Sequence, residues 1–128
     1  MNTLITNGIK ISVEPRYEPE YSNALESKFI FSYHITIENM GREEVQLMRR
    51  HWHIWDSFGI VREVEGEGVV GQQPVIQPGE YYSYASWCQF YTPIGKMQGA
   101  YLMTRPSDQQ SFLVNIPSFV LIAPQILN

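Results

Sequence analysis

The sequence predicts an all-β protein, an antiparallel β-sandwich of seven to eight short strands. Apolar and polar residues alternate with a period of two in several segments, and turns rich in glycine or proline separate these segments. Hydrophobic residues make up 44% of the 128 residues and aromatic residues 13%, with many of the bulky side chains that strands favour. No segment shows a convincing amphipathic helical period. Many short strands at regular spacing are typical of a sandwich.

The N-terminal third contains the most regular alternation. Residues 1–7 are expected to form a loose lead-in, and a first strand is expected over residues 9–14, before a turn-like segment bracketed by Pro15 and Pro19. Residues 29–38 give the clearest strand of the chain. The side chains expected to share its buried face are Phe29, Phe31, Tyr33, Ile35 and Ile37.

A third long strand is expected over residues 43–55, with an irregularity in the middle. Val45 and Leu47 share a face with Arg49, whereas Trp52 lies on the opposite face. A β-bulge near Arg49 and Arg50 would reconcile the two halves, because one extra residue reverses the side on which later side chains lie.

The remaining expected strands complete a single sandwich of two sheets. The Cys…Trp…Cys spacing of true immunoglobulin domains is absent, so the fibronectin type III-like variety of the immunoglobulin-like sandwich fits better. One domain is expected over residues 1–128, with a core of about 8–124. The other expected strands are residues 60–64, 81–87, 97–104, 112–116 and 119–122.

The composition disfavours several function classes. Thirteen acidic residues against nine basic ones give a net charge of −4, which repels a nucleic acid backbone, so no nucleic acid partner is expected. The single cysteine, Cys88, cannot form an internal disulfide. The sequence shows neither a basic leader nor an apolar run long enough to cross a bilayer, so the expected location is the cytoplasm, without membrane insertion.

The glycine-rich loop is the first candidate binding site. Gly66, Gly68 and Gly71 have GxGxxG spacing, but Gln-Gln-Pro follows them and offers no helix, which disfavours a dinucleotide site. Backbone amides of such a loop can bind phosphate or pyrophosphate without a helix, with Arg49 and Arg50 nearby. The alternative is that the glycines serve a sharp turn, with Val69 and Val70 packing as an anchor.

Two histidines form a second candidate site. His51 and His53 lie two residues apart on an expected strand, so both imidazoles project to the same side and could begin a transition-metal site. Asp56, His34 or Cys88 could supply a third ligand. The alternative is that the histidines stack against neighbouring tryptophans and tyrosines.

The sequence offers little support for catalysis. Residues 62–67 faintly resemble the acidic box of diphosphate hydrolases, but the glycines disfavour the helix that would hold magnesium. No nucleophile elbow is present. We therefore expect no enzyme activity and no cofactor, with a phosphohydrolase as the alternative.

A long series of residues nevertheless resembles the ApaG family. The series runs from about Gly8 over almost the whole chain. Its parts are Arg50-His51-Trp52-x-Ile54-x-Asp56-x-x-Gly59, Glu63-Val64-x-Gly66-x-Gly68-Val69-Val70-Gly71-x-x-Pro74, Pro78-Gly79, Tyr84-x-Ser86, Thr92-x-x-Gly95-x-Met97-x-Gly99-x-Tyr101 and Phe112-x-Val114-x-Ile116-Pro117-x-Phe119.

The resemblance implies a fibronectin type III-like sandwich that serves as a stand-alone bacterial protein or as a domain of some eukaryotic F-box proteins. It implies a genetic link to cobalt resistance and magnesium efflux, a protein-interaction role and no established catalytic residues. A sandwich of this kind cannot itself transport an ion, so an efflux role would be indirect. We therefore expect a non-catalytic module with an unidentified protein partner, and a homodimer through exposed sheet edges stays open. The alternative is a protein that binds pyrophosphate, nucleotide or metal through loop 66–71.

Overall fold

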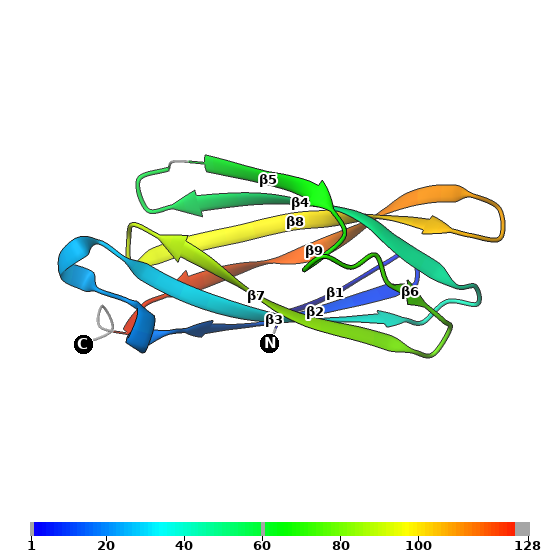
Figure 1. Ribbon diagram of the computed structural model, residues 1–128, viewed down its shortest axis with the longest axis horizontal. Coiled ribbons are helices and arrows are strands. Elements are labelled where there is room, and N and C mark those ends of the chain that lie inside the picture. Colours follow the sequence, from blue (N-terminus) through cyan, green and yellow to red (C-terminus); the bar gives the residue numbers. More distant parts are fainter. Residues whose placement is uncertain (1, 60, 125–128) are drawn as a thin grey trace.

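The protein is an antiparallel β-sandwich of two sheets (Figure 1). The computed structural model describes residues 2–59 and 61–124. The first sheet has the order β1-β2-β3-β7, and the second has the order β5-β4-β8-β9, with β6 also paired to β4. Two short 3-10 helices, η1 and η2, connect β2 to β3. The bounds are β1 (Asn2–Thr6), β2 (Ile9–Tyr17), η1 (Pro19–Tyr21), η2 (Ala24–Glu26), β3 (Phe29–Asn39), β4 (Val45–Asp56), β5 (Val61–Glu67), β6 (Val75–Ile76), β7 (Tyr81–Phe90), β8 (Ile94–Arg105) and β9 (Gln110–Ile122).

The expected sandwich is confirmed, and the strands of the first sheet follow the predicted alternation. All five apolar side chains predicted for the buried face of β3 are buried. They pack against the inward side chains of the second sheet, among which Trp52, Met97 and Tyr101 are almost fully enclosed. Among the described residues, no helix has the length and apolar character needed to span a membrane.

The expected loose lead-in is wrong, because residues 2–6 form a strand. β1 pairs with the first part of β2 through a tight turn at Asn7 and Gly8, both with positive φ (50° and 79°). An Asn-Gly pair is the strongest short-range signal for such a hairpin, and it was present in the sequence. The strand expected at residues 60–64 is β5, and Ile60 lies outside the described residues.

The expected β-bulge in β4 is confirmed. Leu47 faces Met103 on β8 and Arg49 faces Leu102, so Met48 is an extra residue without a partner in this pair. The buried side chains consequently belong to odd-numbered residues before the bulge, as at Leu47, and to even-numbered residues after it, as at Trp52. The bulge turns Arg50 toward the interior side of the sheet and leaves Arg49 exposed on the outer side.

Two prolines lie inside strands, where the sequence analysis expected interruptions. Pro15 lies in β2 beyond the end of β1, so its missing N–H costs no ladder bond on that side. Pro117 lies in β9 at a second irregularity, where Met97 faces Phe119 and Gly99 faces Ile116. Edges and bulges are the places where a sheet tolerates proline.

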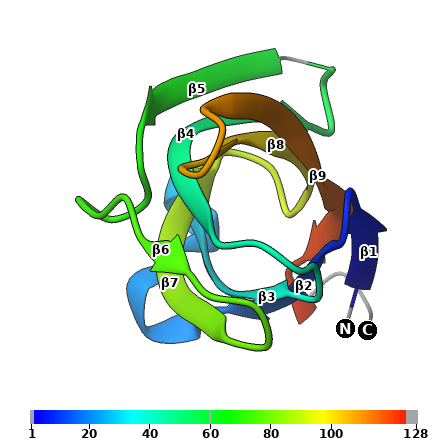
Figure 2. The ribbon, with the colours of Figure 1, turned by 90° about the vertical axis from the view of Figure 1, so that its right-hand side faces the viewer.

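The two long sides of the sandwich differ. On one side β9 lies beside β1 (Figure 2). There the Asn7 side chain donates to the Leu113 carbonyl oxygen, and the Thr6 hydroxyl accepts from the Asn115 amide. On the other side the edge is formed by β5 and the short β6 in the second sheet and by β7 in the first, and β7 pairs with neither of them. This second side, called the open side below, exposes an edge of each sheet.

Buried tyrosines predict loss of stability at alkaline pH. Burial raises the pKa of Tyr33, Tyr84 and Tyr101, although the nearby Arg50 opposes the effect, and the Tyr84 and Tyr101 hydroxyls bond to each other. These groups stay neutral in the folded protein but ionise in the unfolded chain above pH about 10. The free energy of unfolding should therefore be intact below pH about 10 and fall as the pH rises further.

Urea unfolding between pH 8 and 11 tests this expectation. The Tyr84→Phe/Tyr101→Phe double variant removes both hydroxyls and should weaken the pH dependence, whereas Tyr91→Phe, at an exposed position, should leave it unchanged. Parallel losses in the double variant and the wild type would contradict this origin.

Candidate binding site

A cleft opens between the two sheets on the open side. Its volume is about 260 Å³, and it lies between β4 and β5 of one sheet and β7 of the other. Trp52, Ile54 and Met97 contribute apolar wall, and Tyr33 and Ser86 contribute hydroxyl groups. Two arginines, Arg50 and Arg62, supply its positive charge. Apolar walls with a few convergent polar groups are typical of binding sites.

Arg50 connects this cleft to the glycine-rich loop. Its Nη1 atom donates to the carbonyl oxygens of Glu67 and Gly68, each at 3.0 Å. The guanidinium lies over Gly66, its cross-strand partner, where an added Cβ would come within 2.9 Å of Nη1. Gly66 is therefore a strand residue that makes room for Arg50.

Arg62 reaches from β5 across to β7. Its Nη2 atom donates to the Gln89 carbonyl oxygen at 2.6 Å and lies 3.7 Å from the Cys88 Sγ atom. The guanidinium also lies 5.7 Å from the centre of the Phe90 ring. Burial raises the pKa of the Cys88 thiol, and Arg62 opposes that effect. Cys88 is thus a largely buried, protonated thiol at neutral pH.

Within residues 2–59 and 61–124, neither arginine of the cleft has a carboxylate partner. The ion pairs among the described residues involve other cations, and the contacts of Arg50 and Arg62 are carbonyl oxygens, a thiol and a ring. A guanidinium bonds most strongly to carboxylate or phosphate oxygens. The cleft can therefore accept an anionic group.

The free edge of β7 runs along this cleft. The Ile30 amide donates to the Ser22 hydroxyl, and the Ile30 carbonyl oxygen accepts from the Glu18 amide, so both backbone groups of Ile30 point away from β7. Gln89 is the cross-strand partner of Ile30, so the backbone N–H and C=O of Gln89 point away from β3. Backbone direction alternates along a strand. The residues that direct both groups toward the open side, where the Gln89 carbonyl oxygen accepts from Arg62, are therefore Tyr81, Ser83, Ala85, Trp87 and Gln89.

The glycine-rich loop is closed by its own backbone. Val69 and Gln72 exchange two N–H···O bonds at 2.8 and 2.9 Å, and the Gly68 amide donates to Met48. Gly68 and Gly71 have positive φ, as the turn interpretation expects. Val69 is fully buried and anchors the loop, but Val70 is 62% exposed, so the expectation that both valines pack is wrong for Val70.

The structure separates the predicted site residues into two groups. Gly66, Gly68 and Arg50 lie together at the end of the cleft, with Gly71 at the exposed tip of the loop. Arg49, His51 and His53 lie on the outer face of the second sheet, and the histidines are beside Glu63 and Glu65. The sequence pointed to Arg62, with Arg49 and Arg50, as a basic group that could meet an acidic partner or an anion, but neither glutamate was expected as a partner of the histidines. The hairpin at residues 56–59 was the available signal, because it brings β5 back beside β4.

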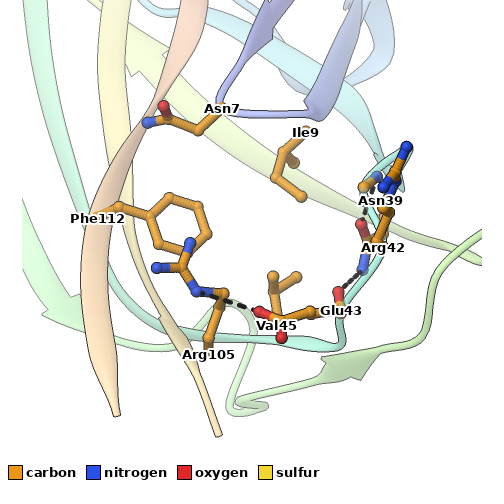
Figure 3. Close-up of a pocket in the computed structure, with 9 residues that line it drawn as sticks. Asn7, Ile9, Asn39, Arg42, Glu43, Val45, Arg105 and Phe112 are labelled. Carbon is orange, nitrogen blue, oxygen red and sulfur yellow. Dashed lines mark hydrogen bonds and ion pairs between the residues drawn. The ribbon is translucent and has the colours of Figure 1, made fainter. Parts of the chain in front are cut away.

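A second hollow, of about 360 Å³, lies at one end of the sandwich (Figure 3). Its Arg105 Nε atom is 3.5 Å from a carboxylate oxygen of Glu43 and 3.5 Å from one of Asp108. The buried Asn39 side chain donates to the carbonyl oxygens of Glu43 and Ile76 and so joins two turns. The polar groups here serve the fold, so this hollow is a weaker candidate.

The two antiparallel sheets define an immunoglobulin-like sandwich of the fibronectin type III-like class. A family model described as the ApaG domain matches residues 19–105. Relatives named Protein ApaG include one from Methylobacterium sp. (strain 4-46), 47% identical over 121 residues that cover 94% of this chain and 92% of the relative. One from Anaeromyxobacter dehalogenans is 44% identical over 128 residues, the full length of both chains.

Among solved structures, a Bordetella pertussis protein, solved as a candidate ApaA protein, is 42% identical with a TM-score of 0.88. The match covers 91% of this chain and 94% of that one. The chain therefore belongs to the ApaG family.

The loop geometry predicts unequal effects for two glycine substitutions. An added Cβ at Gly68 would lie 2.1 Å from the Gln72 carbonyl oxygen, whereas nothing lies within 4 Å of one at Gly71. Both residues have positive φ. Gly71→Ala should cost about 1 kcal/mol of unfolding free energy, and Gly68→Ala about 2 to 4 kcal/mol.

Urea unfolding of the two variants measures this difference. Equal costs would show that the close approach at Gly68 does not constrain the loop.

Proposed function

We propose that this ApaG protein is a non-catalytic, cytoplasmic protein-interaction module that binds an extended, acidic segment of a partner protein on the open side. The segment adds to β7 as a further strand, with its acidic side chains near Arg50 and Arg62. Any part in cobalt resistance or magnesium efflux, which the family resemblance implies, would then be indirect, through the partner.

The observation that carries this proposal is the outer edge of β7, which pairs with no strand of the described residues and is covered at Gln89 by the Arg62 side chain. None of its ten residues is charged and none is proline. Edge strands usually carry charges, prolines or a cover that prevents pairing with another chain. The facing edge strand β5 fits that rule, because Arg62, Glu63, Glu65 and Glu67 give it four charges in seven residues. An unprotected edge is the geometry that strand addition uses.

An apolar hollow beside this edge supports the same conclusion. It has a volume of about 410 Å³ and includes Tyr21, Ile30 and Trp87. The rings of Tyr21 and Trp87 meet edge to face at 5.2 Å, and the two side chains are 57% and 53% exposed. Exposed aromatic side chains of this kind often dominate the affinity of an interface. Alternate side chains of an added strand would reach this hollow.

The phosphate alternative is less well supported by the loop. The amides of Gly68, Val69 and Gln72 already donate within the protein, which leaves few for an anion. The Arg50 guanidinium already donates two hydrogen bonds to carbonyl oxygens of the loop. A pyrophosphate titration nevertheless belongs in the test, because the cleft arginines suit phosphate as well as carboxylate.

Selection of random twelve-residue peptides on the purified protein, followed by affinity measurements, tests the proposal. The selected peptides should contain aspartate or glutamate beside β-branched or aromatic residues. Ala85→Pro should weaken their binding at least about tenfold, because it removes an N–H that strand addition needs while the bonds to β3 stay. Arg62→Glu should weaken it similarly.

Matched controls separate these effects from general damage. Ala85→Val retains the amide, and Arg16→Glu makes the same charge change on β2, at a residue that lines neither the cleft nor the hollow beside β7, so both should bind as the wild type does. Binding that survives Ala85→Pro would contradict strand addition. Amide shifts on Gly66–Gly71 with inorganic pyrophosphate, without peptide binding, would favour the phosphate alternative instead.

A further inference from the structure

The outer face of the second sheet carries a compact group of side chains that the β7 proposal does not use. His51 and His53 lie on β4 after the bulge, and both imidazoles project outward from the sheet. Their ring centres are 4.6 Å apart, and the side chains are 38% and 36% exposed. The His53 ring stacks on Trp55 at 5.9 Å, which restricts its orientation.

The neighbouring strand supplies carboxylates to the same spot. Glu63 is the cross-strand partner of His53, and Glu65 is the partner of His51. The His51 Nε2 atom lies 3.0 Å from the Glu63 Oε2 atom and 3.2 Å from the Glu65 Oε1 atom. The His53 Nε2 atom lies 3.5 Å from the Glu63 Oε1 atom. Glu63 therefore contacts both histidines at once.

We propose that His51, His53 and Glu63 form a binding site for a divalent transition metal ion such as Zn²⁺. One ligand atom of each residue lies within 4.8 Å of the other two. Zinc binds imidazole nitrogen and carboxylate oxygen at about 2.0 to 2.2 Å, so ligand atoms in a tetrahedral site are about 3.3 Å apart. The nitrogen–oxygen distances between the imidazoles and Glu63, 3.0 and 3.5 Å, bracket that spacing.

The local charge also suits a cation. The cations on the same face of the sheet have other cross-strand partners: Arg49 is paired with Glu67, and the Lys96 Nζ atom lies over the ring of its partner Trp55, 5.0 Å from the ring centre. The carboxylates of Glu63 and Glu65 place negative charge directly beside the two imidazoles.

Two imidazoles and a carboxylate favour Zn²⁺ over Mg²⁺, which prefers oxygen ligands alone. Three protein ligands would leave one tetrahedral position for Glu65 or for a ligand from solution. The site faces away from the cleft, so this inference does not depend on the proposed strand addition.

Calorimetric titration with Zn²⁺ at pH 7.5, together with NMR of the histidine side chains, tests the site. The wild type should bind one Zn²⁺ per chain, with shifts at the Nε2 atoms of His51 and His53. His51→Asn, His53→Asn and Glu63→Gln should each weaken binding at least about tenfold. Mg²⁺ should not compete.

The third histidine provides a matched control. His34 lies on β3 in the other sheet, outside the cluster, so His34→Asn should bind Zn²⁺ as the wild type does. All four positions are exposed or half-buried, and circular dichroism checks that the variants fold. Absence of saturable Zn²⁺ binding, or binding that persists in both cluster histidine variants, would overturn the proposal.

Discussion

One extra residue in β4 determines where the functional groups of this protein lie. Met48 has no pairing partner on β8. Strict alternation from Leu47 would place every later side chain of β4 on the wrong face, and the bulge reverses the two faces. Trp52 consequently enters the core, Arg50 turns toward the cleft, and His51 turns outward beside β5. Without the bulge, the tryptophan would face solvent and the histidines would face the core.

The bulge thus separates two kinds of chemistry on neighbouring residues. On the inner side, Arg50 holds the glycine-rich loop and, with Arg62, supplies the positive charge of the cleft. On the outer side, two imidazoles meet two carboxylates at the surface. The sheet between them makes the two surfaces independent, so a ligand on one side need not compete with a ligand on the other.

Much of the fold could be predicted from the sequence, because alternation within a strand is local information. The buried face of β3 and the bulge in β4 were both readable in this way. The relations across strands were not, since they depend on register and on which strands become neighbours. Two such relations across strands are the contacts of Glu63 with both histidines and the hydrogen bond from Arg62 to the Gln89 carbonyl oxygen. β1 was missed although Asn7-Gly8 signalled its hairpin.

Native-state amide hydrogen exchange followed by NMR shows whether the β7 edge is free in solution. Protection should then alternate along the strand, with amides bonded to β3 protected and those facing the open side exchanging much faster. Equal protection of both sets would contradict a free edge, because a second copy or another segment would then cover it. The protected set is Tyr82, Tyr84, Ser86 and Cys88, and the fast set is Tyr81, Ser83, Ala85, Trp87 and Gln89.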